Sequence, residues 1–316
     1  MTRRLSGILI LNITILTLAH AQIGGKAGAY SRLGFGARGI GMGNALTAVT
    51  TGDVVGYYNP AILPSAEYRN ITASFGILTL DRTLNFLSFS QPLEPTAGIS
   101  AGIINSGVSD IDGRDSDGEP TGPLRTSENQ IFLSFANHFN AGFSVGITLK
   151  LLHYHLFTDV NSLTVGIDLG ALVPIGNSVT LGAAVRDINS DYKWDTSNLF
   201  GESGNATIDE FPRLYTFGVA YKLPNGLGLV AMDVEASNQK TLNIRIGVEI
   251  PLIPEITVRG GTDRIDLKEK GNGVKPTFGF TARKNLDNWT PAVNYAYVVE
   301  PFSSSGMHII SLSVIF

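Results

Sequence analysis

The chain has 316 residues, of which 43% are hydrophobic and 16% charged, with 36 glycines, no cysteine and a formal net charge of −4. The acidic balance leaves no basic surface for nucleic acid, and the lack of cysteine excludes disulfide bonds. Beyond its first residues the chain contains no apolar run of about 18 residues, which argues against membrane-spanning helices. The length suits one large all-β domain or two ordinary domains.

Residues 1–21 have the pattern of a secretory signal peptide. Arg3 and Arg4 supply a basic start, residues 5–18 a short apolar core, and residues 19–21 an Ala-His-Ala cleavage site. The apolar core is too short to span a bilayer as an uncleaved anchor, so we expect cleavage. Because no cysteine follows the site, we expect no lipid anchor, and the net charge after cleavage is 21 − 27 = −6.

Residues 22–66 differ from the rest because they are rich in glycine, only weakly apolar and not alternating. We expect one short helix within residues 40–51, flanked by irregular chain. This segment is too long for a simple tail ahead of the first strand. If the strands that follow close into a barrel, the segment fits the interior as a hatch, because irregular backbone is tolerated there.

From residue 67 to residue 316 apolar residues alternate with polar or small ones in a series of stretches. The clearest stretch covers residues 163–173, whose odd-numbered positions are all apolar, and residues 242–250 repeat the pattern. A period of two favours strands over helices, and most stretches have the length of a tilted strand that crosses a bilayer. We predict fourteen strands, near residues 70–79, 82–91, 97–104, 128–138, 141–155, 163–173, 178–187, 212–223, 226–236, 240–250, 254–264, 273–284, 289–298 and 306–316.

The connections between these strands alternate in length. Every second connection is a short turn with proline, asparagine or glycine, whereas the others include long loops near residues 105–127 and 188–211. This asymmetry is typical of outer-membrane barrels, and closure removes the exposed edge of the last strand, which ends at Phe316. We therefore predict an all-β fold, an antiparallel transmembrane barrel over residues 67–316 with the hatch inside. The even number of strands predicts that both chain ends are periplasmic.

Charged residues within the predicted strands support this topology, because they fall on the face opposite the large apolar side chains. A charge that faces lipid at the bilayer centre costs about 2–4 kcal/mol for Arg or Lys. The alternative, a soluble β-sandwich, would need polar outer faces. We interpret the charges as structural ion pairs between neighbouring strands, with a permeation path as the alternative. The predicted lumenal charges are Lys150, Asp168, Arg186, Arg245, Glu249, Arg259 and Arg283.

The hatch region resembles a known family. Residues 36–45 read Gly-Ala-Arg-Gly-Ile-Gly-Met-Gly-Asn-Ala, and residues 57–61 read Tyr-Tyr-Asn-Pro-Ala. These two stretches resemble the N-terminal region of FadL-like outer-membrane barrels, and most closely their PorV/PorQ branch. The chain departs from the fatty-acid branch, in which glycine follows Asn-Pro-Ala, because Ile62 stands there. The matched hatch residues are Gly36, Arg38, Gly39, Gly41, Met42, Gly43, Asn59, Pro60 and Ala61.

The resemblance implies a fourteen-stranded barrel and two alternative functions. In the fatty-acid branch, apolar substrates bind within the barrel and leave sideways through its wall. In the PorV branch, the barrel serves type IX secretion by receiving or handing on exported proteins. We favour the passage of small hydrophobic molecules, with secretion as the alternative and a non-transporting envelope scaffold as a third hypothesis. The candidate contacts to an apolar ligand are Phe35, Ile40, Met42 and Leu46.

The expected partners follow from this interpretation. They are outer-membrane lipid and lipopolysaccharide, the barrel assembly machinery, and either a small apolar substrate or secretion-system proteins. Nucleic acid is not an expected partner, and no cofactor is expected. Gly34, Gly36 and Gly39 match the dinucleotide-binding fingerprint, but no strand leads into it and no βαβ unit surrounds it.

Two other groups of residues are candidate metal sites, and both have a simpler interpretation. His153 and His155 share one face of a predicted strand without a third ligand, so we place them at the membrane interface. The loop near residues 105–127 is a weak calcium candidate that lacks EF-hand spacing, and we interpret it as solvated. Because the histidines have no recognisable nucleophile motif beside them, we predict no enzymatic activity. The acidic residues of the loop are Asp110, Asp112, Asp115 and Asp117.

Overall fold

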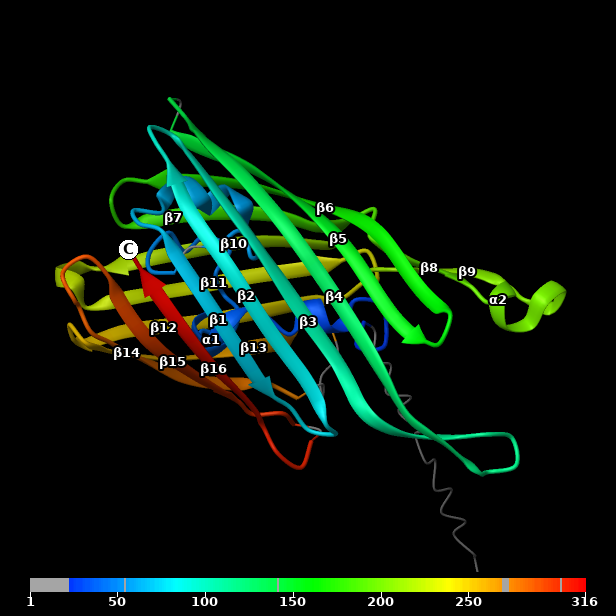
Figure 1. The fold of residues 1–316 in the computed structure, drawn as a ribbon. Helices are drawn as coiled ribbons and strands as arrows, with labels where there is room; N and C mark the ends of the chain where they lie inside the picture. The colour runs from blue at the N-terminus through cyan, green and yellow to red at the C-terminus, as the bar shows by residue number, and fades with distance from the viewer. Residues whose placement is uncertain (1–22, 54, 141, 269–272, 302) are drawn as a thin grey trace, which may run out of the picture.

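The computed structural model describes residues 23–53, 55–140, 142–268, 273–301 and 303–316 (Figure 1). Within these ranges, fourteen antiparallel strands close into one barrel, which confirms the predicted fold class. Around the barrel they follow the order β1-β16-β15-β14-β13-β12-β11-β10-β7-β6-β5-β4-β3-β2. Their bounds are β1 (Asn70–Ile77), β2 (Arg82–Leu93), β3 (Ala97–Arg114), β4 (Pro120–Phe139), β5 (Phe143–Phe157), β6 (Val160–Ile175), β7 (Val179–Ile188), β10 (Leu214–Leu223), β11 (Gly228–Ser237), β12 (Leu242–Ile253), β13 (Ile256–Asp266), β14 (Pro276–Arg283), β15 (Thr290–Val298) and β16 (Met307–Ile315).

The last strand, β16, is paired on both sides. It lies between β15 and β1, and Asn70 of β1 lies opposite Ile315. Beyond the strand ends, the Arg69 and Phe316 backbones exchange N–H···O bonds of 3.1 and 3.0 Å. Closure therefore satisfies the backbone groups of a strand that would otherwise be an aggregation-prone edge.

The barrel presents apolar side chains outward and small, polar or charged side chains inward. On β5, Val145 and Leu149 are exposed, whereas Thr148 and Lys150 are buried. Such an alternation around a closed barrel matches a hydrocarbon slab outside and a polar interior. No helix among the described residues is long and apolar enough to cross a membrane.

The two ends of the barrel differ. One end, here the short-turn end, carries connections such as residues 94–96, 176–178 and η4 (Pro224–Gly226). The opposite end, here the long-loop end, carries residues 189–213, where β8 (Asp191–Asp195) pairs with β9 (Ala206–Glu210). This hairpin, with α2 (Ser197–Phe200) and η3 (Gly201–Ser203) at its tip, projects beyond the barrel wall (Figure 1).

The predicted loop near residues 105–127 is wrong in its extent. The β3–β4 ladder continues outward to the pair Arg114–Pro120, with an irregularity between Val108 and Ile111. The prolonged part is mostly polar on both faces, so it lacks the apolar alternation by which a strand is detected in a sequence. The β8–β9 hairpin in the second predicted loop was missed for a related reason, since it is short and interrupted by turns.

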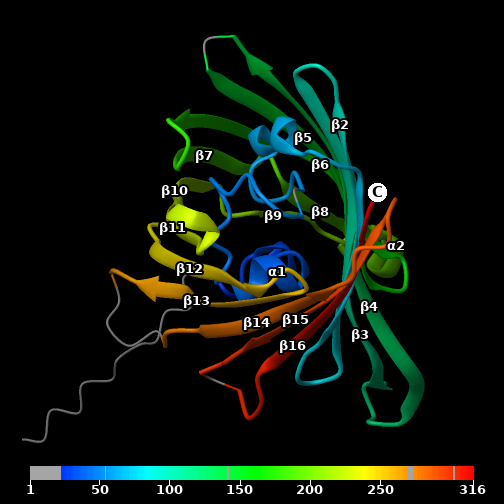
Figure 2. The ribbon, with the colours of Figure 1, turned by 90° about the vertical axis from the view of Figure 1, so that its left-hand side faces the viewer.

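Much of residues 23–66 lies inside the barrel, which is viewed nearly along its axis in Figure 2. This hatch carries η1 (Ala29–Arg32), α1 (Gly36–Gly41) and η2 (Pro60–Ser65). The predicted helix over residues 40–51 is wrong, because the helix ends at Gly41. Gly43 and Asn44 follow with φ angles of 61° and 59°, a left-handed conformation that an α-helix cannot include.

The two ends of the described chain lie at opposite ends of the barrel. Asn70 and Phe316 lie together at the short-turn end, as an even number of strands requires. The hatch, however, runs through the lumen, and Ala27 packs against the buried cluster that includes Trp194 and Phe211, beside the β8–β9 hairpin. The orientation of these ends relative to the periplasm stays a prediction.

Candidate functional site

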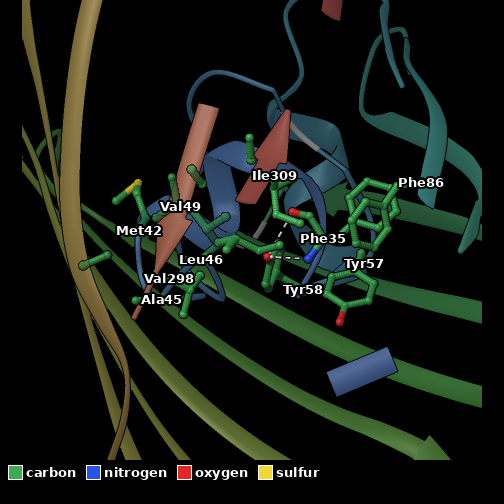
Figure 3. Close-up of a cluster of buried hydrophobic side chains, with 14 of the residues drawn as sticks. Phe35, Met42, Ala45, Leu46, Val49, Tyr57, Tyr58, Phe86, Val298 and Ile309 are labelled. Atoms are coloured by element: carbon green, nitrogen blue, oxygen red, sulfur yellow. Dashed lines mark hydrogen bonds between the residues drawn. The ribbon is translucent and has the colours of Figure 1, made fainter. Parts of the chain in front are cut away.

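The hatch contributes an apolar cluster to the centre of the lumen (Figure 3). Phe35, Ile40, Met42 and Leu46, the four candidate ligand contacts, are each at most 6% exposed. The Phe35 ring lies among aromatic rings of the hatch and of the wall, and the other three residues pack in the same cluster. The lumen is therefore filled at this level by an apolar core rather than by an open aqueous bore.

The hatch contacts the barrel wall closely at glycines that face the lumen. A Cβ atom at Gly146 of β5 would lie 2.6 Å from the carbonyl carbon of Pro60. At Gly182 of β7 it would lie 2.3 Å from the carbonyl oxygen of Thr47, a distance that real Cβ atoms do not adopt. The missing side chains let hatch backbone and strand backbone touch directly. Further wall glycines with a hatch atom within 3.0 Å are Gly98, Gly170, Gly218, Gly247 and Gly261.

The Asn-Pro-Ala stretch ties the hatch to β6. The Asn59 side-chain oxygen accepts a 3.0 Å bond from the Ala61 N–H and thereby caps η2. The Asn59 amide nitrogen donates to the carbonyls of Thr47, at 2.8 Å, and Ala171 of β6, at 3.1 Å. One side chain therefore joins two parts of the hatch to the wall, which gives Asn59 and Pro60 a local structural role.

Arg38 of the hatch motif pairs with the wall. Its Nε and Nη2 atoms each donate to the Glu249 carboxylate of β12 at 2.9 Å, and its Nη1 donates to the Thr51 carbonyl at 2.6 Å. The other partner of Glu249 is Arg259 of β13, at 3.0 Å. A bidentate Arg–carboxylate pair fixes both direction and distance, so Arg38 orients the hatch against β12.

A second ion-pair network crosses β7, β11, β12 and β13. Glu235 accepts from Arg186 at 2.9 Å and from Arg245 at 2.8 Å, and Arg245 also contacts Asp263 at 3.1 Å. Asp263 in turn accepts a 2.9 Å bond from the hatch residue Asn44. These groups are buried, so each charge relies on its partners within the protein.

Two further groups of contacts involve carboxylates of the wall. Lys150 of β5 lies 2.7 Å from Asp168 and 2.8 Å from Asp187. Asp233 of β11 accepts bonds from the backbone N–H of Thr47, at 3.1 Å, and from its hydroxyl, at 2.6 Å. The hatch thus places three polar side chains, those of Arg38, Asn44 and Thr47, on acidic residues of three consecutive strands.

Of the predicted lumenal charges, Lys150, Asp168, Arg186, Arg245, Glu249 and Arg259 lie in these networks. Arg283 instead lies at the short-turn end and donates to Thr257 at 3.1 Å. Sequence reasoning missed Asp187, Asp233, Glu235 and Asp263. The two acids of β11 follow Leu229 and Ala231 on the same face, so that face does not read as polar, although its period of two was visible.

The lumen wall therefore has two halves. The charged half-wall, β5–β7 with β10–β13, holds the ion pairs. In the neutral half-wall, β14–β16 with β1–β4, the charged lumenal side chains among the described residues lie at the strand ends, with the exception of Glu128 of β4, whose carboxylate accepts the Tyr192 hydroxyl toward the long-loop end. The buried polar groups of the neutral half-wall near the hatch include Asn70, Thr72, Ser74, Ser88, Ser90, Asn294, Ser311 and Ser313.

Several cavities border the neutral half-wall, and one of about 40 Å³ lies where this half-wall meets the charged one, beside Arg38, Glu249 and Asn294. The innermost has a volume of about 30 Å³, and Phe35, Leu46, Ile62, Thr72 and Ser311 are among its lining residues. A cavity of about 240 Å³ lies at the short-turn end, and one of about 120 Å³ lies at the long-loop end. The innermost cavity has room for a water molecule or two but not for a hydrophobic molecule of six or more carbons.

The outer face of the charged half-wall carries a groove of about 500 Å³, lined by Leu169, Tyr215 and Phe217 among others. Behind it the wall is continuous, because β6 and β7 pair without a gap from Leu169–Val185 to Ile175–Val179. The structure therefore has no opening through the wall at this groove.

An aromatic cluster covers part of the long-loop end. Tyr192, Trp194 and Phe211 of the 189–213 connection pack with Tyr154 of β5 and with Ala27 of the hatch. Burial raises the pKa of the Tyr192 phenol, whose hydroxyl donates to Glu128 at 3.0 Å. The phenol is thus a neutral donor at ordinary pH, and the cluster joins the start of the hatch to the β8–β9 hairpin.

The metal candidates do not assemble into a site. No group of three or more His, Cys, Asp or Glu side chains in the described part of the chain could hold a metal ion. In the acidic loop, Asp112 pairs with Arg114 at 2.7 Å, and Asp115 accepts from the N–H groups of Asp117 and Glu119. His155 bonds Asn161 at 2.7 Å on the β5–β6 hairpin.

Comparisons with known proteins support the fold. No protein-family model matches the chain. A protein-arginine kinase of Clostridium acetobutylicum is 27% identical over 111 residues, so the match spans only 32% of that protein's length and shows no shared family. The toluene transporter TodX of Pseudomonas putida superposes with a TM-score of 0.62 at 14% identity, over 89% of this chain and 96% of TodX. A FadL homologue of Pseudomonas aeruginosa gives 0.57 at 10% identity, over 89% and 98%. At these identities the likeness establishes a FadL-like barrel fold.

Proposed function

We propose that this protein is an outer-membrane barrel that passes small hydrophobic molecules. The observation that carries the proposal is the apolar cluster around Phe35, which lies in the middle of the lumen and borders the innermost cavity. A polar porin would be expected to hold water at this level instead. The fold is shared with TodX, which is described as a toluene transporter.

Passage requires the hatch to shift. The innermost cavity, at about 30 Å³, is far smaller than the roughly 150 Å³ that accommodates benzene in a protein interior. Because the charged half-wall holds the hatch by ion pairs, the neutral half-wall is the side on which displacement costs less.

A disulfide tether tests this requirement. A Cβ at Gly41 would lie 3.5 Å from the Cβ of Ala296 on β15, within the range for a disulfide, and the chain has no other cysteine. In Gram-negative cells that express the protein, we expect faster uptake of radiolabelled toluene than in cells with an empty vector. Oxidised Gly41→Cys/Ala296→Cys should lose that gain and recover it on reduction.

The single variants Gly41→Cys and Ala296→Cys are the matched controls, and labelled oleate tests whether long-chain acids are also carried. Equal toluene uptake with and without the wild-type protein would remove the proposal. Uptake that persists in the oxidised double variant would instead show that passage does not need this part of the hatch to move.

A second candidate, a role in type IX secretion, rests on the resemblance of residues 36–45 to the PorV/PorQ branch. The contacts of Arg38, Gly41 and Gly43 with the barrel wall explain the presence of these residues without any role in secretion. Deletion of the gene distinguishes the candidates: an altered secreted proteome with unchanged toluene uptake would favour secretion, and no change in either would favour an envelope scaffold. The proposed location in the outer membrane, with lipopolysaccharide and the barrel assembly machinery as partners, is tested by fractionation.

A further inference from the structure

Phe35 fills a pocket made of aromatic rings. Its ring centroid lies 4.9 Å from that of Phe86 on β2 and 5.2 Å from that of Tyr57 of the hatch (Figure 3). A third ring, that of Phe132 on β4, lies 5.8 Å away. The planes are tilted or edge-on, the arrangements that aromatic pairs favour. Since Phe35 is 4% exposed, the pocket encloses one benzene ring on nearly all sides.

The backbone around Phe35 permits this residue to move. Gly34 and Gly36 flank it with φ angles of 114° and 66°, values that other residues rarely adopt. A Cβ at Gly36 would have no neighbour closer than the Ser74 hydroxyl, at 3.9 Å, so glycine is present there for its conformation and not for lack of space. The Phe35 backbone is held by the Tyr58 hydroxyl, which accepts from the Phe35 N–H at 2.9 Å and lies 3.1 Å from the Phe35 carbonyl, so withdrawal of Phe35 has to break its contacts with this one side chain.

The Phe35 ring also separates its own pocket from empty space. It lines the innermost cavity, which continues between Leu46, Val49 and Ile62 on the hatch side and Thr72 and Ser311 on the neutral half-wall. Withdrawal of the ring would therefore join the space of one aromatic ring to an existing cavity.

We propose that the pocket filled by Phe35 is a binding site for one uncharged monocyclic aromatic molecule, and that Phe35 occupies it when no ligand is bound. This inference rests on the proposed function and names the substrate class of the same site. The ligand is uncharged because the cation on the cavity lining, Arg38, is already paired with Glu249. A carboxylate would enter an apolar pocket without a free partner, which is strongly unfavourable.

Removal of the Phe35 side chain should expose the site. Purified Phe35→Ala in detergent is titrated with fluorobenzene and followed by fluorine NMR, with wild type beside it. The matched control is Phe280→Ala, which removes a phenyl ring from the outer face of β14, where Phe280 is 42% exposed. We expect Phe35→Ala to bind fluorobenzene at least about tenfold more tightly than wild type, a difference of about 1.4 kcal/mol, and Phe280→Ala to match wild type.

Three results would overturn the inference. The first is equal binding of fluorobenzene by Phe35→Ala and Phe280→Ala, and the second is equal binding of fluorobenzoate and fluorobenzene by Phe35→Ala. The third is that adding Phe86→Leu to Phe35→Ala leaves fluorobenzene binding unchanged. The heat-dependent gel mobility of the folded barrel checks that each variant has folded. If Phe35→Ala does not fold, Phe35→Val is used, with an intermediate gain expected and no gain counting against the site.

The binding and uptake measurements together distinguish a failure of this inference from a failure of the proposed function. Fluorobenzene binding by Phe35→Ala without toluene uptake by wild-type cells would leave the site and remove the transport function. Toluene uptake by wild-type cells, with no gain in binding for Phe35→Ala, would leave the function and remove this site.

Discussion

The charged and neutral half-walls of the lumen enclose the same hatch by different means. On the charged half-wall, Arg38, Asn44 and Thr47 bind carboxylates of the wall, and most of the wall glycines at which hatch backbone touches strand backbone lie here, Gly98 of β3 on the neutral half-wall being an exception. On the neutral half-wall the hatch makes uncharged bonds, such as Ala37 N–H to the Ser311 hydroxyl at 2.8 Å and the Thr277 hydroxyl to the Gly41 carbonyl at 3.1 Å.

This difference indicates that one half-wall holds the hatch in place and that the other allows it to rearrange. Buried charges that depend on each other resist any motion that separates them, because an unpaired buried charge is costly. Hydroxyl and amide groups exchange partners at lower cost, and water can replace them. The ion pairs therefore anchor the hatch on one side, and cavities border the side on which rearrangement is easier.

The largest expected effect is on the charged half-wall. Glu235→Ala leaves the guanidinium groups of Arg186 and Arg245 without their shared carboxylate. We expect the free energy of unfolding to fall by about 3–5 kcal/mol, measured by urea denaturation in lipid vesicles. If the free energy of unfolding falls by less than it does when a hydroxyl of the neutral half-wall is removed, the comparison between the two halves is wrong.

The next effect concerns the link between hatch and wall. Arg38→Met removes the bidentate pair with Glu249, which keeps its bond to Arg259. We expect a loss of about 1.5–3 kcal/mol, the usual value for hydrogen bonds to a charged group, and faster proteolysis of the hatch at constant barrel stability. Unchanged proteolysis would show that the glycine contacts alone anchor the hatch.

A steric test addresses those glycine contacts. A Cβ at Gly247 would lie 2.3 Å from the Met42 carbonyl oxygen, so Gly247→Ala must push hatch or strand away. We expect destabilisation of about 1–3 kcal/mol by overpacking. Gly260→Ala on β13 is the matched control, because the nearest neighbour of its Cβ, the Thr277 carbonyl oxygen, lies 3.6 Å away in ordinary contact. Equal effects of the two variants would indicate a general cost of alanine in these strands.

The smallest effect is expected on the neutral half-wall. Ser74→Ala removes a 2.7 Å bond to the Ser311 hydroxyl, which still binds the Ala37 N–H. We expect a loss of about 0.5–1.5 kcal/mol in the same urea assay. A loss as large as that of Glu235→Ala would show that both halves hold the barrel equally firmly.

The strands were predictable because each carries its own signal. Apolar residues at alternate positions of residues 163–173 and 242–250 mark the lipid face, whatever the rest of the chain does. The outer part of β3 and β4 escaped detection, because outside the lipid no face needs to be apolar. The hatch helix was misplaced because its end depends on Gly43, which is pressed against Thr262 of a strand more than two hundred residues away.

The candidate site was predictable only in part. The sequence singled out Phe35, Arg38 and the Asn-Pro-Ala stretch, and the structure gives each of them specific contacts. It did not indicate that Glu249 and Asp263 would bind the hatch, nor that Phe86 and Phe132 would surround Phe35.

The sequence by itself determined the barrel, its fourteen strands and the presence of an irregular segment before them. These follow from local alternation and from turn chemistry, which do not depend on distant residues. The tertiary structure alone decided which half of the lumen is charged around the hatch, where the cavities lie and which ring fills the central pocket. Such features depend on strand order and register, since closure brings side chains together that are far apart in the chain.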